Sequence, residues 1–432
     1  MCHNRTPYEH CISYLMTPTQ FSIIFMVTLA CTTLARLWLA RRQLAHIAAH
    51  RVEVPAVFRE KIQLSDHQKA ADYTSAKTRF GILGILFDAA LLLAFTVVGG
   101  IQFIADVSHS WFGSPLAQGM AVIIAVLVLS SLLEAPFGLY RTFVIEARFG
   151  FNKTSFALYL ADALKGLLIG AALGLPLLFS VLWLMERMGG YWWLYVWGVW
   201  VGFNLLILFI YPSFIAPLFN KFTALQDETM KARIKALLNR CGFTAQGLFV
   251  MDGSRRSAHG NAYFTGFGKT KRIVFFDTLL ARLSINEVEA VLAHELGHFK
   301  HRHVVKRIVA TFAISLGFLW LLGLLMQTEW FYQGLGVYTP STALALLLFF
   351  MTLPVFSFLL GPVMSAYSRK HEFEADAYAA KQTGASDLVN ALVKLYQDNA
   401  ATLTPDPLYS RFYDSHPPAM VRIAHLQALP QN

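Results

Sequence analysis

The chain has 432 residues, of which 56% are hydrophobic and only 14% are charged. An average soluble domain is about 25% charged, so the composition excludes an ordinary soluble protein. Together with a mean hydropathy of +0.48, it indicates that a lipid bilayer surrounds much of the chain. The formal net charge of +10 is compatible with binding to nucleic acid, binding to an anionic membrane surface, or the charge asymmetry of a multispanning membrane protein. The position of the charges along the chain decides between these three possibilities.

The N-terminal region carries no basic stretch followed by a short apolar core and a cleavage site, so we expect no removable signal peptide. Met16 directly precedes the first apolar stretch and is an alternative start. The four cysteines are widely separated, which argues against both a disulfide scaffold and a cysteine metal site. They are Cys2, Cys11, Cys31 and Cys241.

Seven segments are long and apolar enough to cross about 30 Å of hydrocarbon as helices. We expect them at residues 21–40, 82–104, 116–133, 166–185, 192–211, 308–326 and 343–366. The connection 41–79 is rich in Lys and Arg, whereas 105–115 and 327–342 contain neither. The first connection is therefore expected in the cytoplasm, which puts the N-terminus outside and the C-terminus inside. The positive charge is then largely topological, and no basic motif predicts a nucleic-acid partner.

The cytoplasmic segment after the fifth span is expected to contain both helices and strands. Residues 227–240 have helical periodicity and end before Gly242, a favourable helix stop. Short β-branched and aromatic runs at 247–251, 262–267 and 273–276 predict a small sheet. Ser284 and Glu287 then form a capping-box pattern for a helix that runs through His298.

This last helix contains the pattern His-Glu-x-x-His at residues 294–298. Residues four apart lie on one helix face, so His294 and His298 can bind one Zn²⁺ ion. Zinc lowers the pKa of a water molecule to about 7, and Glu295 is suited to take its proton as general base and return it to the leaving amine. The alternative is a helix with two exposed histidines, so a third ligand is needed.

Glu372 is the preferred third ligand. The metzincin continuation requires histidine at position 304, which is Val304, and we interpret His301 and His303 as part of a basic helix face near the membrane. Glu372 and Asp376 are four residues apart beyond the last span and share a helix face. Asp376 is suited to accept a hydrogen bond from a ligand histidine. Without the histidine pair, a solvated charged helix end would be the default interpretation.

Several further motifs occur in order along the chain. They are residues 67–73 (HQKAADY), 149–154 (FGFNKT), 261–264 (NAYF), 294–298 (HELGH), 372–376 (EFEAD) and 415–418 (SHPP), followed by Arg422. With these motifs the sequence resembles, over nearly its whole length, the type I CAAX prenyl protease family of integral-membrane zinc metalloproteases. The compact form suits a bacterial-type homologue.

The resemblance implies a mostly α-helical fold in which seven transmembrane helices enclose a chamber, closed on the cytoplasmic side by a small α+β, gluzincin-like protease domain. It implies one Zn²⁺ per chain, bound by His294, His298 and Glu372, with Glu295 as the base. His416 would stabilise the oxyanion, a donor role commonly worth a hundredfold or more in rate. Arg422 would orient neighbouring groups.

The resemblance also implies that four consecutive residues form an edge strand on which an extended peptide lies, with an ordinary internal strand as the alternative. They are Asn261, Ala262, Tyr263 and Phe264. We expect four successive parts of the chain. Residues 1–216 form a membrane region with five helices, and residues 217–303 form the first segment of the protease domain. Residues 304–366 form the sixth and seventh membrane helices, and residues 367–432 form the second segment of the protease domain.

The expected function is hydrolysis of peptide bonds by a membrane zinc endopeptidase. In the family, substrates include prenylated CAAX proteins, which lose their last three residues. A heat-shock-type quality-control protease and a membrane scaffold with structural zinc are the alternatives. The expected surroundings are a lipid bilayer, in a bacterial inner membrane or, for a eukaryotic chain, the endoplasmic reticulum.

Overall fold

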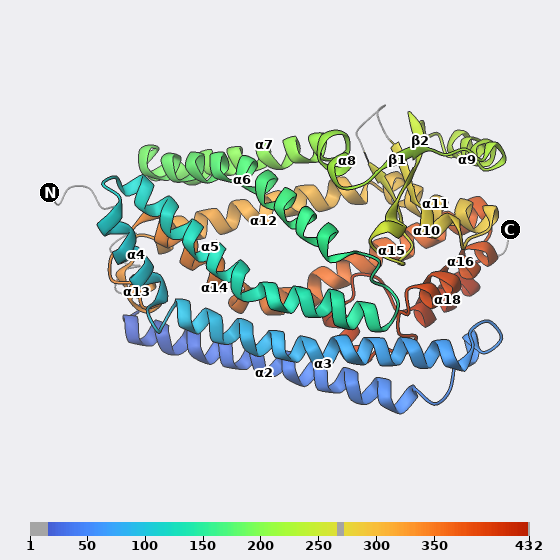
Figure 1. Cartoon of the computed structure of the whole chain (residues 1–432), viewed down its shortest axis with the longest axis horizontal. Helices are drawn as coiled ribbons and strands as arrows, with labels where there is room; N and C mark the ends of the chain where they lie inside the picture. The colour runs from blue at the N-terminus through green and yellow to red at the C-terminus, as the bar shows by residue number, and fades with distance from the viewer. Residues whose placement is uncertain (1–15, 266–271, 431–432) are drawn as a thin grey trace.

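The structure is a computed structural model that describes residues 16–265 and 272–430. Two of the sequence-based expectations therefore lie outside the described residues: the external N-terminus with Cys2 and Cys11, and positions 266–267 of the second predicted strand. The molecule is elongated, with the long helices running along its length and the strands gathered at one end (Figure 1).

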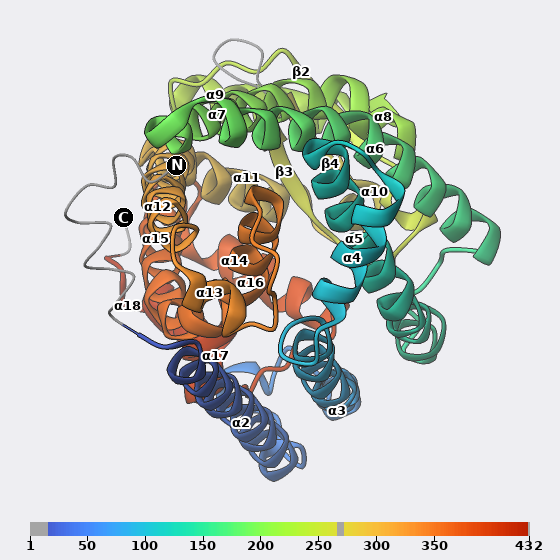
Figure 2. The ribbon, with the colours of Figure 1, turned by 90° about the vertical axis from the view of Figure 1, so that its left-hand side faces the viewer.

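Seven helical runs in the described chain are long and apolar enough to span a membrane. They are Pro18–His50 (α2), Leu64–Phe95 (α3), Pro115–Glu146 (α5 with a π-helical end), Phe156–Arg187 (α6), Gly189–Phe219 (including α7, Trp192–Ile210, and α8, Ala216–Phe219), His303–Leu325 (α12) and Thr342–Thr383 (α14, Thr342–Ser357, and α15, Gly361–Thr383). Each overlaps one predicted span. Viewed along the long axis, the helices lie around a common centre (Figure 2).

The ends of these helices follow local capping chemistry. Thr17 and Gln20 form a capping box at the start of α2, and the side chains of Ser114 and Ser341 accept backbone N–H groups at the starts of α5 and α14. These caps satisfy N–H groups that have no partner within the helix.

The second predicted span, 82–104, is wrong at its C-terminal boundary. Helix α3 ends at Phe95, and a separate helix, α4 (Gly100–Trp111), follows. Gly99 has φ +92° in the turn, and a β-carbon on Gly100 would lie 2.7 Å from the carbonyl oxygen of Ala94. The apolar sequence continues through this turn, so hydropathy alone does not show where the helix ends. The turn depends on a backbone conformation that the glycine pair permits.

The remaining α-helices and strands are shorter. They are α13 (Glu329–Gln333), β1 (Phe222–Ala224), α9 (Glu228–Arg240), β2 (Gly247–Met251), β3 (Ala262–Thr265), β4 (Arg272–Phe276), α10 (Asp277–Leu280), α11 (Ile285–Lys300), α16 (Ala385–Asp398), α17 (Pro407–Tyr413) and α18 (Ala419–Ala428).

The four strands form one mixed sheet in the order β1-β2-β4-β3. Strand β2 pairs in parallel with β4, and the two outer strands are antiparallel to their neighbours. Strand β1 was not predicted, since three residues carry too little periodicity to be recognised. Strand β3 lies at an edge, with one side of its backbone unpaired in the described sheet.

Two separate stretches of sequence share the hydrophobic core beside this sheet. Strand β4, α9 and α11 contribute Ile273, Ile234 and Leu296, while α16 and α18 contribute Leu388 and Ile423 from the last part of the chain. Two membrane-spanning runs separate these stretches in sequence. The core therefore brings α11 against α15, which is the contact that builds the site.

Candidate active site

Helix α11 carries the His-Glu-x-x-His pattern and begins at the predicted capping box. The Ser284 side chain accepts the backbone N–H of Glu287, and the Glu287 carboxylate accepts the N–H of Ser284 at 2.7 Å. Gly297 faces α15 so closely that a β-carbon there would lie 2.9 Å from the Cα of Ala375. This small residue lets the two helices approach, and the approach brings Glu372 to the histidines.

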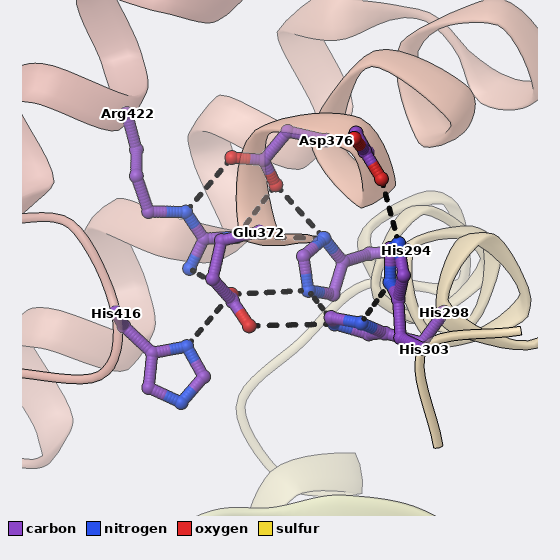
Figure 3. A network of polar contacts seen from close by, with 8 residues as sticks. His294, His298, His303, Glu372, Asp376, His416 and Arg422 are labelled. Atoms are coloured by element: carbon purple, nitrogen blue, oxygen red, sulfur yellow. Dashed lines mark hydrogen bonds and ion pairs between the residues drawn. The ribbon is translucent and has the colours of Figure 1, made fainter. Parts of the chain in front are cut away.

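The predicted ligand atoms converge (Figure 3). The Nε2 atoms of His294 and His298 are 3.2 Å apart, and the Glu372 carboxylate oxygens lie 3.5 Å and 3.4 Å from them. Tetrahedral ligands at about 2.0 to 2.1 Å from Zn²⁺ are about 3.3 Å from one another. The three side chains therefore have the donor types and the mutual spacing that a zinc ion requires.

Asp376 and Arg422 hold His294 from the side opposite the ligand atoms. Asp376 lies 2.8 Å from His294 Nδ1, and Arg422 donates to both oxygens of the same carboxylate at 2.6 Å and 2.9 Å. All three side chains are buried. A carboxylate on Nδ1 fixes the proton there and leaves Nε2 free to bind a metal.

The pKa values of the two histidines differ strongly in the metal-free protein. Burial disfavours a charged His294 ring, but the Asp376 and Glu372 carboxylates outweigh it and raise its pKa to about 9. Burial and the neighbouring His294 charge lower the pKa of His298 to about 3. Metal ligation requires neutral imidazoles, so a metal must displace the proton held by His294.

Glu295 lies beside the ligands and lines a cavity of about 200 Å³ that also includes Asn261, Ala262 and His416. Burial raises the pKa of the Glu295 carboxyl group. A raised pKa brings a carboxylate closer to the range in which it can accept and return a proton near neutral pH. The geometry therefore suits Glu295 to general base chemistry.

His416 lies in the loop before α18, and its Nδ1 atom is 2.7 Å from the Glu372 carboxylate. The side chain is 63% exposed, and it lies beside Glu372, on the side away from His294 and His298 (Figure 3). Its role at the oxyanion stays a prediction.

His303 does not lie on the predicted basic helix face near the membrane. It is fully buried, and its two ring nitrogens lie 2.9 Å from His298 Nδ1 and 2.8 Å from Glu374. The prediction was wrong because α11 ends at Lys300 and Arg302 adopts a left-handed conformation with φ +56°, which breaks the assumed helical face. His301 is exposed. Nothing in the residue spacing signals this break.

The four predicted peptide-binding residues divide between different surroundings. Asn261 and Ala262 line the cavity of Glu295, and the Asn261 side chain accepts the backbone N–H of Ala262 at 2.8 Å. The Tyr263 ring lies edge-on to Phe276, and Phe264 packs edge-on to Phe299. Of the four residues, Asn261 and Ala262 line this cavity, and the backbone of β3 offers the edge of the sheet.

Two family models match consecutive parts of the chain. Residues 43–221 match the CAAX prenyl protease N-terminal region, described as five membrane helices, and residues 224–429 match Peptidase family M48.

Curated relatives match over most of their lengths. A CAAX prenyl protease 1 homolog from Oryza sativa subsp. japonica is 38% identical over 71% of this chain and 73% of the relative. CAAX prenyl protease 1 from Saccharomyces cerevisiae is 33% identical over 87% of this chain and 88% of the relative.

The crystal structure of S. mikatae Ste24p matches with a TM-score of 0.85 and 31% identity, covering 98% of this chain and all of that one. This similarity confirms the expected fold of seven membrane helices around a chamber with a small mixed sheet. The chain therefore belongs to peptidase family M48, as a multi-pass membrane metallopeptidase of the CAAX prenyl protease 1 family.

Proposed function

We propose that this protein is a zinc endopeptidase that holds one Zn²⁺ between His294, His298 and Glu372. The observation that carries the proposal is the triangle of ligand atoms, with edges of 3.2 to 3.5 Å. Zinc bound there supplies a Lewis acid and lowers the pKa of the attacking water. A scaffold with structural zinc is less favoured, because such sites have four protein ligands and are rich in cysteine.

The protein's own side chains divide the work of hydrolysis. Glu295 takes a proton from the attacking water and returns it to the leaving amine. His416 donates to the oxyanion of the tetrahedral intermediate. Asp376, braced by Arg422, keeps the His294 ring in one orientation.

The free edge of β3 supports binding of an extended peptide. Asn261 O accepts from Phe276 N at 2.9 Å, so it faces β4, and the alternation of an antiparallel ladder turns the C=O of Ala262 and the N–H and C=O groups of Phe264 to the open side. The Ala262 N–H is bound by the Asn261 side chain. Main-chain pairing on such an edge binds many sequences. Asn261 and Ala262 would hold the peptide beside Glu295, with Tyr263 and Phe264 contributing through their backbone.

The proposed substrate is a prenylated protein ending in a CAAX motif, from which the last three residues are removed. The names of the Oryza and Saccharomyces relatives support this class. The alternative is cleavage of unprenylated or misfolded membrane proteins.

We propose that residues 217–303 and 367–432 form one protease domain on the cytoplasmic side, with membrane regions at 1–216 and 304–366. The shared hydrophobic core supports the pairing, and the Lys- and Arg-rich connection 41–79 supports the orientation. A bacterial inner membrane, or the endoplasmic reticulum for a eukaryotic chain, stays the predicted location.

The test uses the purified full chain in detergent or liposomes. We expect about one zinc per chain by elemental analysis, and Glu295→Gln should retain the metal but lose peptidase activity. A single CAAX peptide is then compared with and without its farnesyl group. Faster cleavage of the farnesylated form supports the substrate class, whereas equal rates favour the alternative. Full activity of the Glu295→Gln variant would remove Glu295 from the mechanism.

A further inference from the structure

His298 makes a contact on the side of its ring that faces away from Glu372. Its Nδ1 atom lies 2.9 Å from His303 Nδ1, while its Nε2 atom belongs to the converging ligand group. On the far side of the second ring, His303 Nε2 lies 2.8 Å from an oxygen of Glu374. The three side chains therefore form a continuous row, His298–His303–Glu374, of which Figure 3 shows the two histidines.

The direction of the hydrogen bonds in this row follows from the role of His298. When Nε2 offers its lone pair to zinc, the neutral ring carries its proton on Nδ1 and donates it to His303 Nδ1. His303 accepts there, so its own proton is on Nε2, and it donates that proton to the Glu374 carboxylate. Each ring nitrogen of the two histidines then has a partner for its proton or its lone pair.

The fold holds His303 in one position. The left-handed Arg302, φ +56°, ends α11 and starts α12 at His303, whose side chain is fully buried. The ring of His371 stacks on His303 at a centroid distance of 4.0 Å with an interplanar angle of 10°. A non-glycine residue in this conformation is costly, and such strain is typical of segments that serve a site.

We propose that His303 and Glu374 are positioning residues that fix the tautomer and ring plane of His298 for metal binding. The inference rests on the proposed zinc site. It gives each ligand histidine a carboxylate, which Asp376 supplies to His294 directly and Glu374 supplies to His298 through His303. Removing partners of this kind typically lowers metal affinity 10- to 100-fold.

A second cation is the competing interpretation. Ligand atoms of His301, His303 and Glu374 lie within 4.8 Å of one another. The 2.8 Å distance between His303 Nε2 and Glu374 is that of a hydrogen bond, and His301 is exposed. The geometry therefore favours the row of hydrogen bonds.

The experiment measures zinc affinity by competition with a chromophoric chelator, which is independent of peptidase activity. His303→Leu should bind zinc 10- to 100-fold more weakly than wild type. His303→Asn should recover part of the loss, because its side-chain oxygen replaces the acceptor at Nδ1. Glu374→Ala should weaken binding less, since Glu374 is 30% exposed and water can replace it. The matched control is His301→Ala, which removes an exposed ring stacked on His303 at a centroid distance of 5.5 Å but no hydrogen bond of the row. It should bind zinc as wild type does, because the hydrogen bonds fix the tautomer of His298.

Circular dichroism and thermal unfolding of the metal-free variants separate positioning from misfolding, and the Co²⁺ absorption spectrum reports the ligand field. We expect an altered Co²⁺ spectrum for His303→Leu and an unchanged one for His301→Ala. Wild-type zinc affinity in a folded His303→Leu variant would overturn the inference while leaving the zinc site intact. The inference would also be overturned if His303→Asn bound zinc no more tightly than His303→Leu. A second zinc equivalent that is present in the wild type and lost in His301→Ala would overturn it as well. A wild-type chain without zinc would instead contradict the proposed function.

Discussion

The close packing of α11 on α15 at Gly297 gives a quantitative prediction for Gly297→Ala. The added β-carbon would lie 2.9 Å from Cα and 3.1 Å from O of Ala375, both backbone atoms that cannot rotate away. Restoring a contact of 3.4 Å requires the helices to separate by about 0.5 Å. Metal–ligand distances tolerate only about 0.2 Å, so this separation should move Glu372 out of range of the two histidines.

Two opposing effects set the stability of this variant. Alanine is favoured over glycine in a helix interior by about 1 kcal/mol, whereas overpacking typically costs about 1 to 3 kcal/mol. We expect a net loss of about 1 kcal/mol in the free energy of unfolding. Zinc affinity should fall more sharply, by about tenfold or more, as for loss of a supporting contact.

The assay combines reversible unfolding in detergent with zinc competition on the same preparations. Gly317→Ala in α12 is the matched control, since a β-carbon there meets no atom within 4 Å. It should leave zinc affinity unchanged and keep or raise stability. If Gly297→Ala bound zinc as tightly as wild type, the approach of α11 to α15 would not set the ligand spacing.

Three further predictions concern the surroundings of the ligands. Asp376→Ala should destabilise the fold by about 3 to 5 kcal/mol, because Arg422 loses its buried partner. Thermal unfolding of the metal-free protein measures this loss of stability, and Asp376→Asn should lose less stability than Asp376→Ala. Arg302→Gly should raise stability by about 1 kcal/mol through relief of its left-handed backbone, with zinc affinity unchanged. Because the pKa of His294 is raised to about 9, zinc should displace about one proton per chain at pH 7, and zinc affinity should rise with pH up to about 9. Calorimetry in buffers of different ionisation enthalpy counts the displaced protons. A count of zero would contradict the raised pKa of His294.

Positions that depend on helical spacing could be predicted from the sequence, while the roles of these residues as zinc ligands stay predictions. The i and i+4 positions of His294 and His298 follow from the period of one helix, and the capping box at Ser284 follows from local hydrogen bonding. Glu372 was selected because a pair of histidines needs a third donor, and the α11–α15 contact brings it to them.

Features that depend on a break in periodicity were missed. His303 is buried because the left-handed conformation of Arg302 separates α11 from α12. Helix α3 ends at Phe95, before the Gly99 turn, although the apolar sequence continues. The side chains of Tyr263 and Phe264 pack away from the cavity, which the strand motif alone does not reveal. Each of these depends on a single backbone conformation or on tertiary packing.

The two histidines and Glu372 are separated in sequence by the complete excursion of α12 through α14. During synthesis, the ribosome therefore releases the histidine-bearing helix long before the glutamate-bearing one. The proposed zinc ligands can therefore come together only after α12 and α14 have been synthesised.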